Sequence, residues 1–312
     1  MSARASVATR PGKPDARRAS TAKPVIAGVT ITHPDRVVYP DSGVTKLAVA
    51  EYYASVADRL LPYVGDRPLS IVRCPEGAGA ECFYQKHPGR YRIPGVDVAM
   101  IRERTGRKPY IVASSARALV GLAQANALEL HAWGATVESI DRPDTLVIDL
   151  DPDRGLAWSA VVAAAREARA VLEGVDIAPL VKTTGGSGVH LVVPLEPRHS
   201  WEQVRAFARS VATRLEQRAP ERFTATPGEK HRRGKVFVDY LRNSRGATAV
   251  VPYSMRARPG ATVATPLAWD ELSRDAPPSS FTIATVPKRI VRTKDPWADY
   301  GKRRQRLPAK AL

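Results

Sequence analysis

The chain has 312 residues and a mass of 33.9 kDa, which is enough for a substantial core in one large domain or two small ones. Lys and Arg outnumber Asp and Glu by 48 to 31, so the formal net charge is +17 and the pI is about 10.2. This excess predicts attraction to polyanions, most commonly nucleic acid, although a solubilising surface or charged tails would give the same numbers, and no run of about 18 apolar residues is present to span a membrane.

The first predicted element is a disordered basic arm over residues 1–24. These residues are rich in Ala, Ser, Arg, Pro and Lys and contain almost no large apolar side chain, so they cannot bury enough surface to offset chain entropy. They also lack the apolar stretch of a secretory signal. Helix and strand patterns alternate from residue 25 to residue 296, and we predict the folded domain there.

Four helices are predicted from apolar side chains at helical spacing and from capping residues at their ends. They are a helix capped by Thr45 that ends by Pro62, a helix that begins near Ser115 and carries Leu119 and Leu130, a helix over residues 158–173 that stops at Gly174, and a helix that begins at Ser200.

Runs rich in β-branched residues predict strands at residues 146–150, 180–184, 189–195, 236–241 and 248–253. The chain is therefore predicted to be a mixed α/β or α+β protein with its strands concentrated in the second half. Residues 297–312 are predicted to form a second loose basic tail. Cys74 and Cys82 lie eight apart with no second pair, which is neither a disulfide framework nor a zinc pattern, so reduced thiols in the cytoplasm are expected.

The sharpest chemical signal is the segment TLVIDLDPD at residues 145–153. In a strand, alternate side chains share a face, so Asp149 and Asp151 point the same way from α-carbons roughly 6.5 Å apart. Two such carboxylates can converge on one or two divalent ions, which would relieve their mutual repulsion. A strand end whose acids cap a turn at Pro152 is the plainer alternative, because D-x-D is common by chance.

A third acid, Asp239, lies in the apolar strand KVFVDYLRN at residues 235–243. An unpaired charge there is costly, so a cation or ligand is expected beside it, and Arg242 is the structural candidate. Three acids on two strands are also what two-metal phosphoryl transfer needs.

Between the two acid motifs lies KTTGGSGVHLVVPL, residues 182–195, in which Gly185, Gly186 and Gly188 allow the backbone to approach a phosphate. The segment is neither a Walker A loop nor a Rossmann fingerprint, and by itself it could be an ordinary glycine-rich hairpin.

These three blocks, in this order, resemble the polymerase domain of bacterial DNA ligase D, within the archaeo-eukaryotic primase superfamily. The segments THPDRVVYPDSGVTKLAVAEYY (32–53), ECFYQKH (81–87), LELHAWGA (128–135) and VVPYSMRARPGATVATPLAWDEL (250–272) are similar to that family as well. The resemblance covers about residues 28–296. It implies an α/β palm in which a central, mainly antiparallel sheet carries the three aspartates, with helices around it.

The resemblance also implies roles for individual residues. Asp149, Asp151 and Asp239 match the metal-binding triad, which holds two Mn²⁺ (or Mg²⁺) ions. Residues that match nucleotide-binding positions are Phe83, Tyr84, His131, Thr184, Ser187, His190 and Arg256. Residues that match positions for the 5′-phosphate beyond a gap are Arg36 and Lys46, and Arg232 matches a loop that handles the primer end.

Structural alternatives remain for several of these residues. Phe83 and Tyr84 could belong to the core, His131 could be a helix-end partner, and Lys46 could be a solvated lysine, although it is poorly placed for the helix dipole. Thr184 and Ser187 stand where the family often has Ser and Lys, which puts triphosphate affinity in doubt. Arg242, in place of a frequent Gln, could compensate, and Arg36 keeps the charge of a common Lys.

The implied reaction is attack of a primer 3′-hydroxyl on the α-phosphate of a nucleoside triphosphate, with ribonucleotides favoured, to fill gaps and extend ends in non-homologous end joining. The implied partners are DNA ends, gapped DNA with a 5′-phosphate, Ku and an ATP-dependent DNA ligase, in the bacterial cytoplasm at the nucleoid. Two rival classes are a non-catalytic DNA-end binding module, which would not need the three acids, and a metal-dependent nuclease, which would shorten the DNA.

Overall fold

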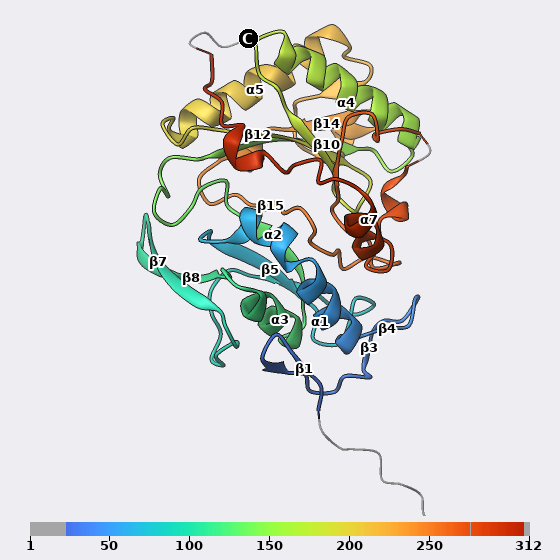
Figure 1. Cartoon of the computed structure of the whole chain (residues 1–312). Helices are drawn as coiled ribbons and strands as arrows, with labels where there is room; N and C mark the ends of the chain where they lie inside the picture. The colour runs from blue at the N-terminus through green and yellow to red at the C-terminus, as the bar shows by residue number, and fades with distance from the viewer. Residues whose placement is uncertain (1–22, 275, 309–312) are drawn as a thin grey trace, which may run out of the picture.

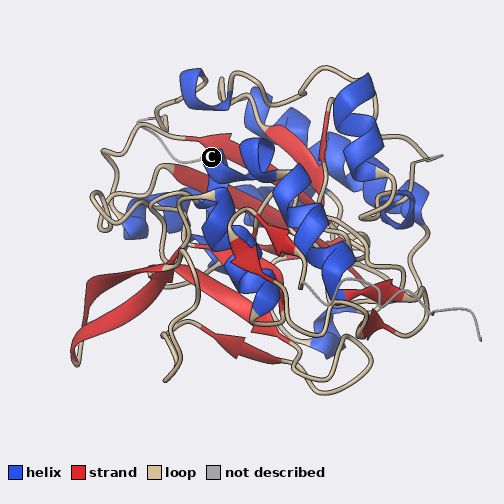
Figure 2. Cartoon of the chain, turned by 60° about the horizontal axis from the view of Figure 1, so that its bottom comes forward, coloured by secondary structure: helices blue, strands red, loops and turns tan. Residues whose placement is uncertain are grey.

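The computed structural model describes residues 23–274 and 276–308, and its two large sheets occupy the upper and lower halves of Figure 1. Helices lie against the strands of both halves (Figure 2). The mixed α/β class expected from the sequence is confirmed. The prediction that the strands are concentrated in the second half is wrong, because the lower sheet is built mainly from the first half of the chain.

The upper sheet is antiparallel except where β13 pairs with β14. Its strands lie in the order β13 (Phe223–Thr224), β14 (Val236–Asp239), β10 (Thr145–Pro152), β12 (Val189–Pro194), β11 (Leu180–Thr183) and β16 (Pro266–Leu267). Two long helices, α4 (Trp158–Glu173) and α5 (Trp201–Arg218), pack on one face. Leu146, Ile148 and Leu150 lie in the apolar cluster with these helices, whereas Val147 packs in the cluster of the lower half. The other face of β10 therefore looks toward the lower sheet.

The lower sheet is antiparallel throughout. Its strands lie in the order β15 (Ala249–Val250), β9 (Ala127–Ala132), β5 (Leu69–Arg73), β8 (Gly106–Val112) and β7 (Asp97–Glu103), and β6 (Phe83–Gln85) pairs with β5. The helices of this half are α1 (Lys46–Ser55), α2 (Ala57–Val64) and α3 (Ala116–Gln124). Smaller elements are β1 (Val25–Ile26), β2 (Val29–Thr30), β3 (Val37–Tyr39), β4 (Val44–Thr45), α6 (Glu229–Arg232) and α7 (Val286–Arg292).

The helix starts agree with the predicted caps. The side chains of Thr45, Ser115 and Ser200 accept hydrogen bonds from the first turns of α1, α3 and α5. Helix α4 has the predicted bounds. Two predictions are wrong: the first helix is divided at Val56 into α1 and α2, with Pro62 inside α2, and Leu130 belongs to strand β9 rather than to α3.

The segment from Trp297 to residue 308 packs on the fold, so the prediction of a loose tail is wrong there. Trp297 is 1% exposed, its ring stacks on that of Tyr300 at 5.8 Å, and its Nε1 donates to the Val181 carbonyl of β11. Further along, the Gln305 backbone pairs with Pro194 and Glu196. Aromatic side chains in this segment make burial favourable despite its positive charge. Residues 1–22 of the arm predicted over residues 1–24, and the last four residues, lie outside the described part of the chain.

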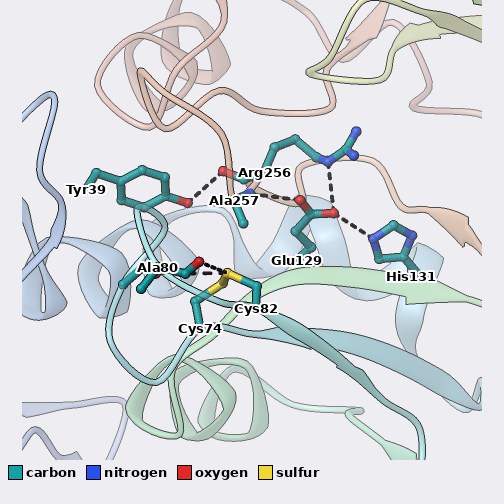
Figure 3. Close-up of a disulfide and its surroundings, with 9 residues drawn as sticks. Tyr39, Cys74, Ala80, Cys82, Glu129, His131, Arg256 and Ala257 are labelled. Carbon is teal, nitrogen blue, oxygen red and sulfur yellow. Dashed lines mark hydrogen bonds and ion pairs between the residues drawn. A yellow bond between two sulfur atoms is a disulfide. The ribbon is translucent and has the colours of Figure 1, made fainter.

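Cys74 and Cys82 form a disulfide, with α-carbons 4.4 Å apart, in the loop between β5 and β6 (Figure 3). The expectation of two reduced thiols is therefore wrong, and the cysteines give no support to a reducing compartment. Within residues 23–274 and 276–308, no helix has the length and hydrophobicity needed to cross a bilayer.

Candidate active site

Three aspartates meet on the face of the upper sheet that is turned away from α4 and α5. Asp149 of β10 is the direct cross-strand partner of Asp239 of β14. Asp151 lies two residues further along β10, so all three side chains share the face of Val147. Asp149 and Asp239 are only 7% and 8% exposed. The strand pattern in the sequence thus predicted the common face of Asp149 and Asp151, and the register between β10 and β14 places Asp239 beside them.

Two arginines and a histidine of the chain contact these carboxylates. Arg242 Nε lies 3.1 Å from Asp149 Oδ2 and 3.1 Å from Asp239 Oδ2. Arg232 pairs with Asp151, and His190 Nε2 lies 3.3 Å from Asp149 Oδ1. Arg242 is thus the neighbouring cation that the sequence suggested.

The three carboxyl groups differ in their acidity. Burial favours the neutral form of Asp149, but His190 and Arg242 outweigh it and hold its pKa well below the usual range. Burial raises the pKa of Asp151, and the charge of Asp149 adds to the effect. Burial also raises the pKa of Asp239, against the opposing effect of Arg242. Keeping Asp151 and Asp239 ionised beside Asp149 therefore costs free energy, because the pKa values of both are raised.

Carboxylate oxygens on a partly buried face are the ligands that Mn²⁺ and Mg²⁺ prefer. The donor set of Asp149, Asp151 and Asp239 fits such ions in type. As the side chains are placed, no group of three or more His, Cys, Asp or Glu in the described part of the chain could hold a metal ion. Two of the three carboxylates are instead directed at Arg242 and the third at Arg232.

The glycine-rich turn between β11 and β12 lies beside the aspartates. A side chain at Gly188 would come within 2.5 Å of the Leu150 carbonyl, so β10 leaves no room for one. Gly185 has φ +68 and lies against Arg256. The Thr184 hydroxyl donates to the Gly188 carbonyl and accepts from the Gly186 amide, so this threonine shapes the turn.

One pocket of about 600 Å³ joins these parts. Predicted site residues that line it are Tyr84, His131, Asp149, Asp151, Thr184, Ser187, His190, Arg242 and Arg256. The lining contains two of the three acids, Asp149 and Asp151, together with the glycine-rich turn and three arginines, whereas Asp239 lies just outside it. The structure therefore brings together most of the residues assigned to the metal and to the nucleotide.

Phe83 and Tyr84 do not face the pocket together. They are successive residues of β6 and so point to opposite faces of the sheet. The Tyr84 ring makes an edge contact with His131 at 5.5 Å, whereas the Phe83 ring lies under Arg73 at 5.8 Å. Both side chains are exposed, at 44% and 67%, so the alternative that they belong to the core is wrong.

Two residues in or next to the pocket were missed in the sequence. Arg258 lines the pocket and lies beside Gly186. Glu129 is 5% exposed, and its Oε2 lies 2.8 Å from Nε2 of His131. An acid between two leucines of the buried strand LELHA is similar to the signal that singled out Asp239, and it could have identified Glu129.

Arg36 and Lys46 line a separate pocket of about 1370 Å³, together with Arg73, Arg90 and Arg92. Arg36 Nη2 donates to Asn126 Oδ1 at 2.8 Å, and its Nε has no hydrogen-bond partner within the described residues. Lys46 opens helix α1 and is 5% exposed, which contradicts the alternative of a solvated lysine. Burial and the charge of Arg36 lower the pKa of Lys46 to about 8. The pocket is a strongly cationic recess at the start of a helix.

A protein-family model described as the primase-polymerase domain of LigD matches residues 45–297. The chain is 42% identical over 298 residues to the multifunctional non-homologous end joining protein LigD of Pseudomonas aeruginosa, covering 94% of this chain and 36% of that protein. It is 33% identical over 291 residues to the bifunctional LigD of Bacillus subtilis, covering 93% and 47%. The chain thus spans less than half the length of these relatives.

A solved structure of the polymerase domain from Mycobacterium tuberculosis ligase D, in complex with DNA, superposes with a TM-score of 0.79 at 34% identity. The superposition covers 86% of this chain and 96% of that domain.

Proposed function

The chain belongs to the LigD primase-polymerase domain family, and we propose that it is a metal-dependent nucleotidyltransferase that fills gaps and extends DNA ends in non-homologous end joining. The observation that carries the proposal is the cross-strand pair Asp149 and Asp239 at the edge of a pocket that is lined by Asp149, Asp151, the glycine-rich turn and Arg256. Acids beside an anion-binding turn are suited to transfer of a phosphoryl group.

Asp149, Asp151 and Asp239 would hold two Mn²⁺ or Mg²⁺ ions, which would activate the primer 3′-hydroxyl and stabilise the leaving pyrophosphate. The glycine-rich turn, His190 and Arg256 would bind the triphosphate. Tyr84 would stack on the base, and Arg232 would contact the primer end. Arg232 and Arg242 neutralise the acids when no other cation does. We propose Ku and an ATP-dependent DNA ligase as the partners in this role. The proposed place of action is the bacterial nucleoid.

One assay separates this function from its two rivals. A labelled primer on gapped DNA is incubated with Mn²⁺ and nucleoside triphosphates. A polymerase lengthens the primer, a binding module leaves it unchanged and a nuclease shortens it. An unchanged or shortened primer would refute the proposed function.

We expect ribonucleotides to be incorporated more efficiently than deoxyribonucleotides. His131 lines the nucleotide pocket next to Tyr84, and a polar side chain there can distinguish a sugar with a 2′-hydroxyl from one without it. The measurement is kcat/KM for one matched base in both forms on the same primer-template. A clear preference for the deoxy form would contradict the expectation.

The pocket of Arg36 and Lys46 would receive the 5′-phosphate on the far side of a gap. Because the pKa of Lys46 is about 8 in the free protein, affinity for that phosphate should fall as the pH rises through 8 and Lys46 loses its charge. The measurement is binding of gapped duplexes with and without the 5′-phosphate on both sides of pH 8. An equal decline for both duplexes would show that Lys46 does not contact the phosphate.

A further inference from the structure

Glu129 lies behind the nucleotide pocket and contacts two of its walls at once (Figure 3). Its Oε2 is 2.8 Å from Nε2 of His131 and 3.0 Å from Nε of Arg256. Its Oε1 accepts a hydrogen bond of 2.8 Å from the backbone N–H of Ala257. The Tyr39 hydroxyl donates to the Arg256 carbonyl and fixes the same segment from the other side. The buried carboxylate of Glu129 thus contacts both His131, which is assigned to the sugar, and Arg256, which is assigned to the phosphates.

The protonation of this pair follows from its surroundings. Burial favours the neutral form of Glu129, but His131, Arg256 and the Ala257 amide outweigh it and lower its pKa to about 2. An ionised carboxylate only accepts hydrogen bonds, so the His131 nitrogen that faces it must carry the proton. Burial lowers the pKa of His131 more than Glu129 raises it, so the imidazole is neutral near pH 7.

A neutral imidazole carries one proton, so Nδ1 of His131 is a bare acceptor. The ring lines the nucleotide pocket, in edge contact with Tyr84. A nitrogen without a proton can accept a hydrogen bond from a sugar hydroxyl. It forms no such hydrogen bond when the hydroxyl is replaced by a fluorine or a hydrogen atom on the same carbon.

Resting on the function proposed above, we propose that Glu129 is a positioning residue that holds His131 in the tautomer with bare Nδ1. The pocket then selects nucleotides whose sugar donates a hydroxyl at that point. Because the same carboxylate anchors Arg256, sugar selection and triphosphate position are coupled through one side chain.

The first experiment uses the wild-type protein and four forms of one matched nucleotide: ribo, 2′-deoxy, 2′-fluoro and 3′-deoxy. A 2′-fluoro group accepts hydrogen bonds but does not donate them. We expect the 2′-deoxy and 2′-fluoro forms to be equally poor if the 2′-hydroxyl is the donor, by about tenfold for one such hydrogen bond. A loss confined to the 3′-deoxy form would instead identify the 3′-hydroxyl. A 2′-fluoro nucleotide used as well as the ribonucleotide, with the 3′-deoxy form undiminished, would overturn the proposal.

The second experiment tests Glu129 itself with Glu129→Gln, His131→Ala and the double variant. The glutamine keeps the shape of the side chain, but its amide can donate to Nε2 and so move the imidazole proton to Nδ1. Each single variant should lose the discrimination between ribo and 2′-fluoro nucleotides, and the double variant should lose no more than His131→Ala alone. Full selectivity in Glu129→Gln would show that the carboxylate is only structural.

The tautomer can be read without any activity. Nitrogen-15 NMR of the His131 ring should show Nε2 protonated and Nδ1 bare in the wild type, and the reverse in Glu129→Gln. A doubly protonated ring, or a bare Nε2 in the wild type, would overturn the proposal even if primer extension is seen. If the protein extends no primer at all, the proposed function fails, while the spectrum still decides the role of Glu129.

Discussion

Replacing Asp239 or Asp149 by alanine is expected to reduce primer extension at least about a hundredfold, because ion positioning contributes several kcal/mol to the transition state of phosphoryl transfer. DNA binding should survive, because the DNA contacts proposed for this chain come from basic residues outside the acid cluster. The measurement is single-nucleotide extension by each variant, with DNA affinity measured in parallel.

The matched control is Asp141→Ala, an exposed acid that pairs with Arg245. It removes one carboxylate but lies outside the lining of the nucleotide pocket, so extension should stay near the wild-type rate. Thermal unfolding checks that the active-site variants remain folded. Undiminished extension by Asp239→Ala or Asp149→Ala would refute the assignment of these acids as metal ligands.

The second large effect is expected for the variant in which both Arg36 and Lys46 are changed to alanine. Hydrogen bonds to a charged group contribute about 1.5–3 kcal/mol each, so removing two should abolish a preference of about a hundredfold or more for a 5′-phosphorylated gap. The salt dependence of log affinity should also flatten by about 0.9 for each phosphate that the variant no longer neutralises. Extension on a simple primer-template should remain largely intact, since this pocket is separate from the acids.

A double variant of Arg205 and Arg209 is the matched control, because it removes the same charge from the exposed face of helix α5. Gapped duplexes with and without the 5′-phosphate are compared across a salt series. If the wild type ignores the phosphate, or the pocket variant still discriminates as well as the α5 control, the phosphate is bound elsewhere.

The features that could be predicted from the sequence are those set by neighbouring residues. Capping by Thr45, Ser115 and Ser200 is local chemistry, and the period of two in TLVIDLD placed Asp149 and Asp151 on one face without knowledge of the fold. That Asp239 lies close to Asp149 was inferred only because two-metal chemistry needs a third acid. The structure shows the contact, since the register between β10 and β14 makes the two residues cross-strand partners.

The features that were missed depend on residues far apart in the chain. Glu129 accepts a hydrogen bond from the backbone N–H of Ala257, which is 128 positions away, and no local pattern predicts that contact. The strands of the lower sheet other than β15 were missed because they lack a clear alternation: β7 exposes Val98 and Met100, and β8 contains a proline. Trp297 was assigned to a tail because its neighbours are charged, although its burial is decided by Tyr63 and Tyr300.

The buried aromatic segment at the end of the described chain connects the lower and upper halves of the molecule. Trp297 contacts Tyr63 of α2 in the lower half and donates to Val181 of the upper sheet, while the Tyr300 hydroxyl bonds to Thr145 of the strand that carries two of the aspartates. The nucleotide pocket draws its walls from both halves, with His131 on one side and Asp149 on the other. Side chains outside the lining of that pocket therefore hold its two walls together, and a fragment that stopped at residue 296 would lack the contacts of Trp297 and Tyr300 that join them.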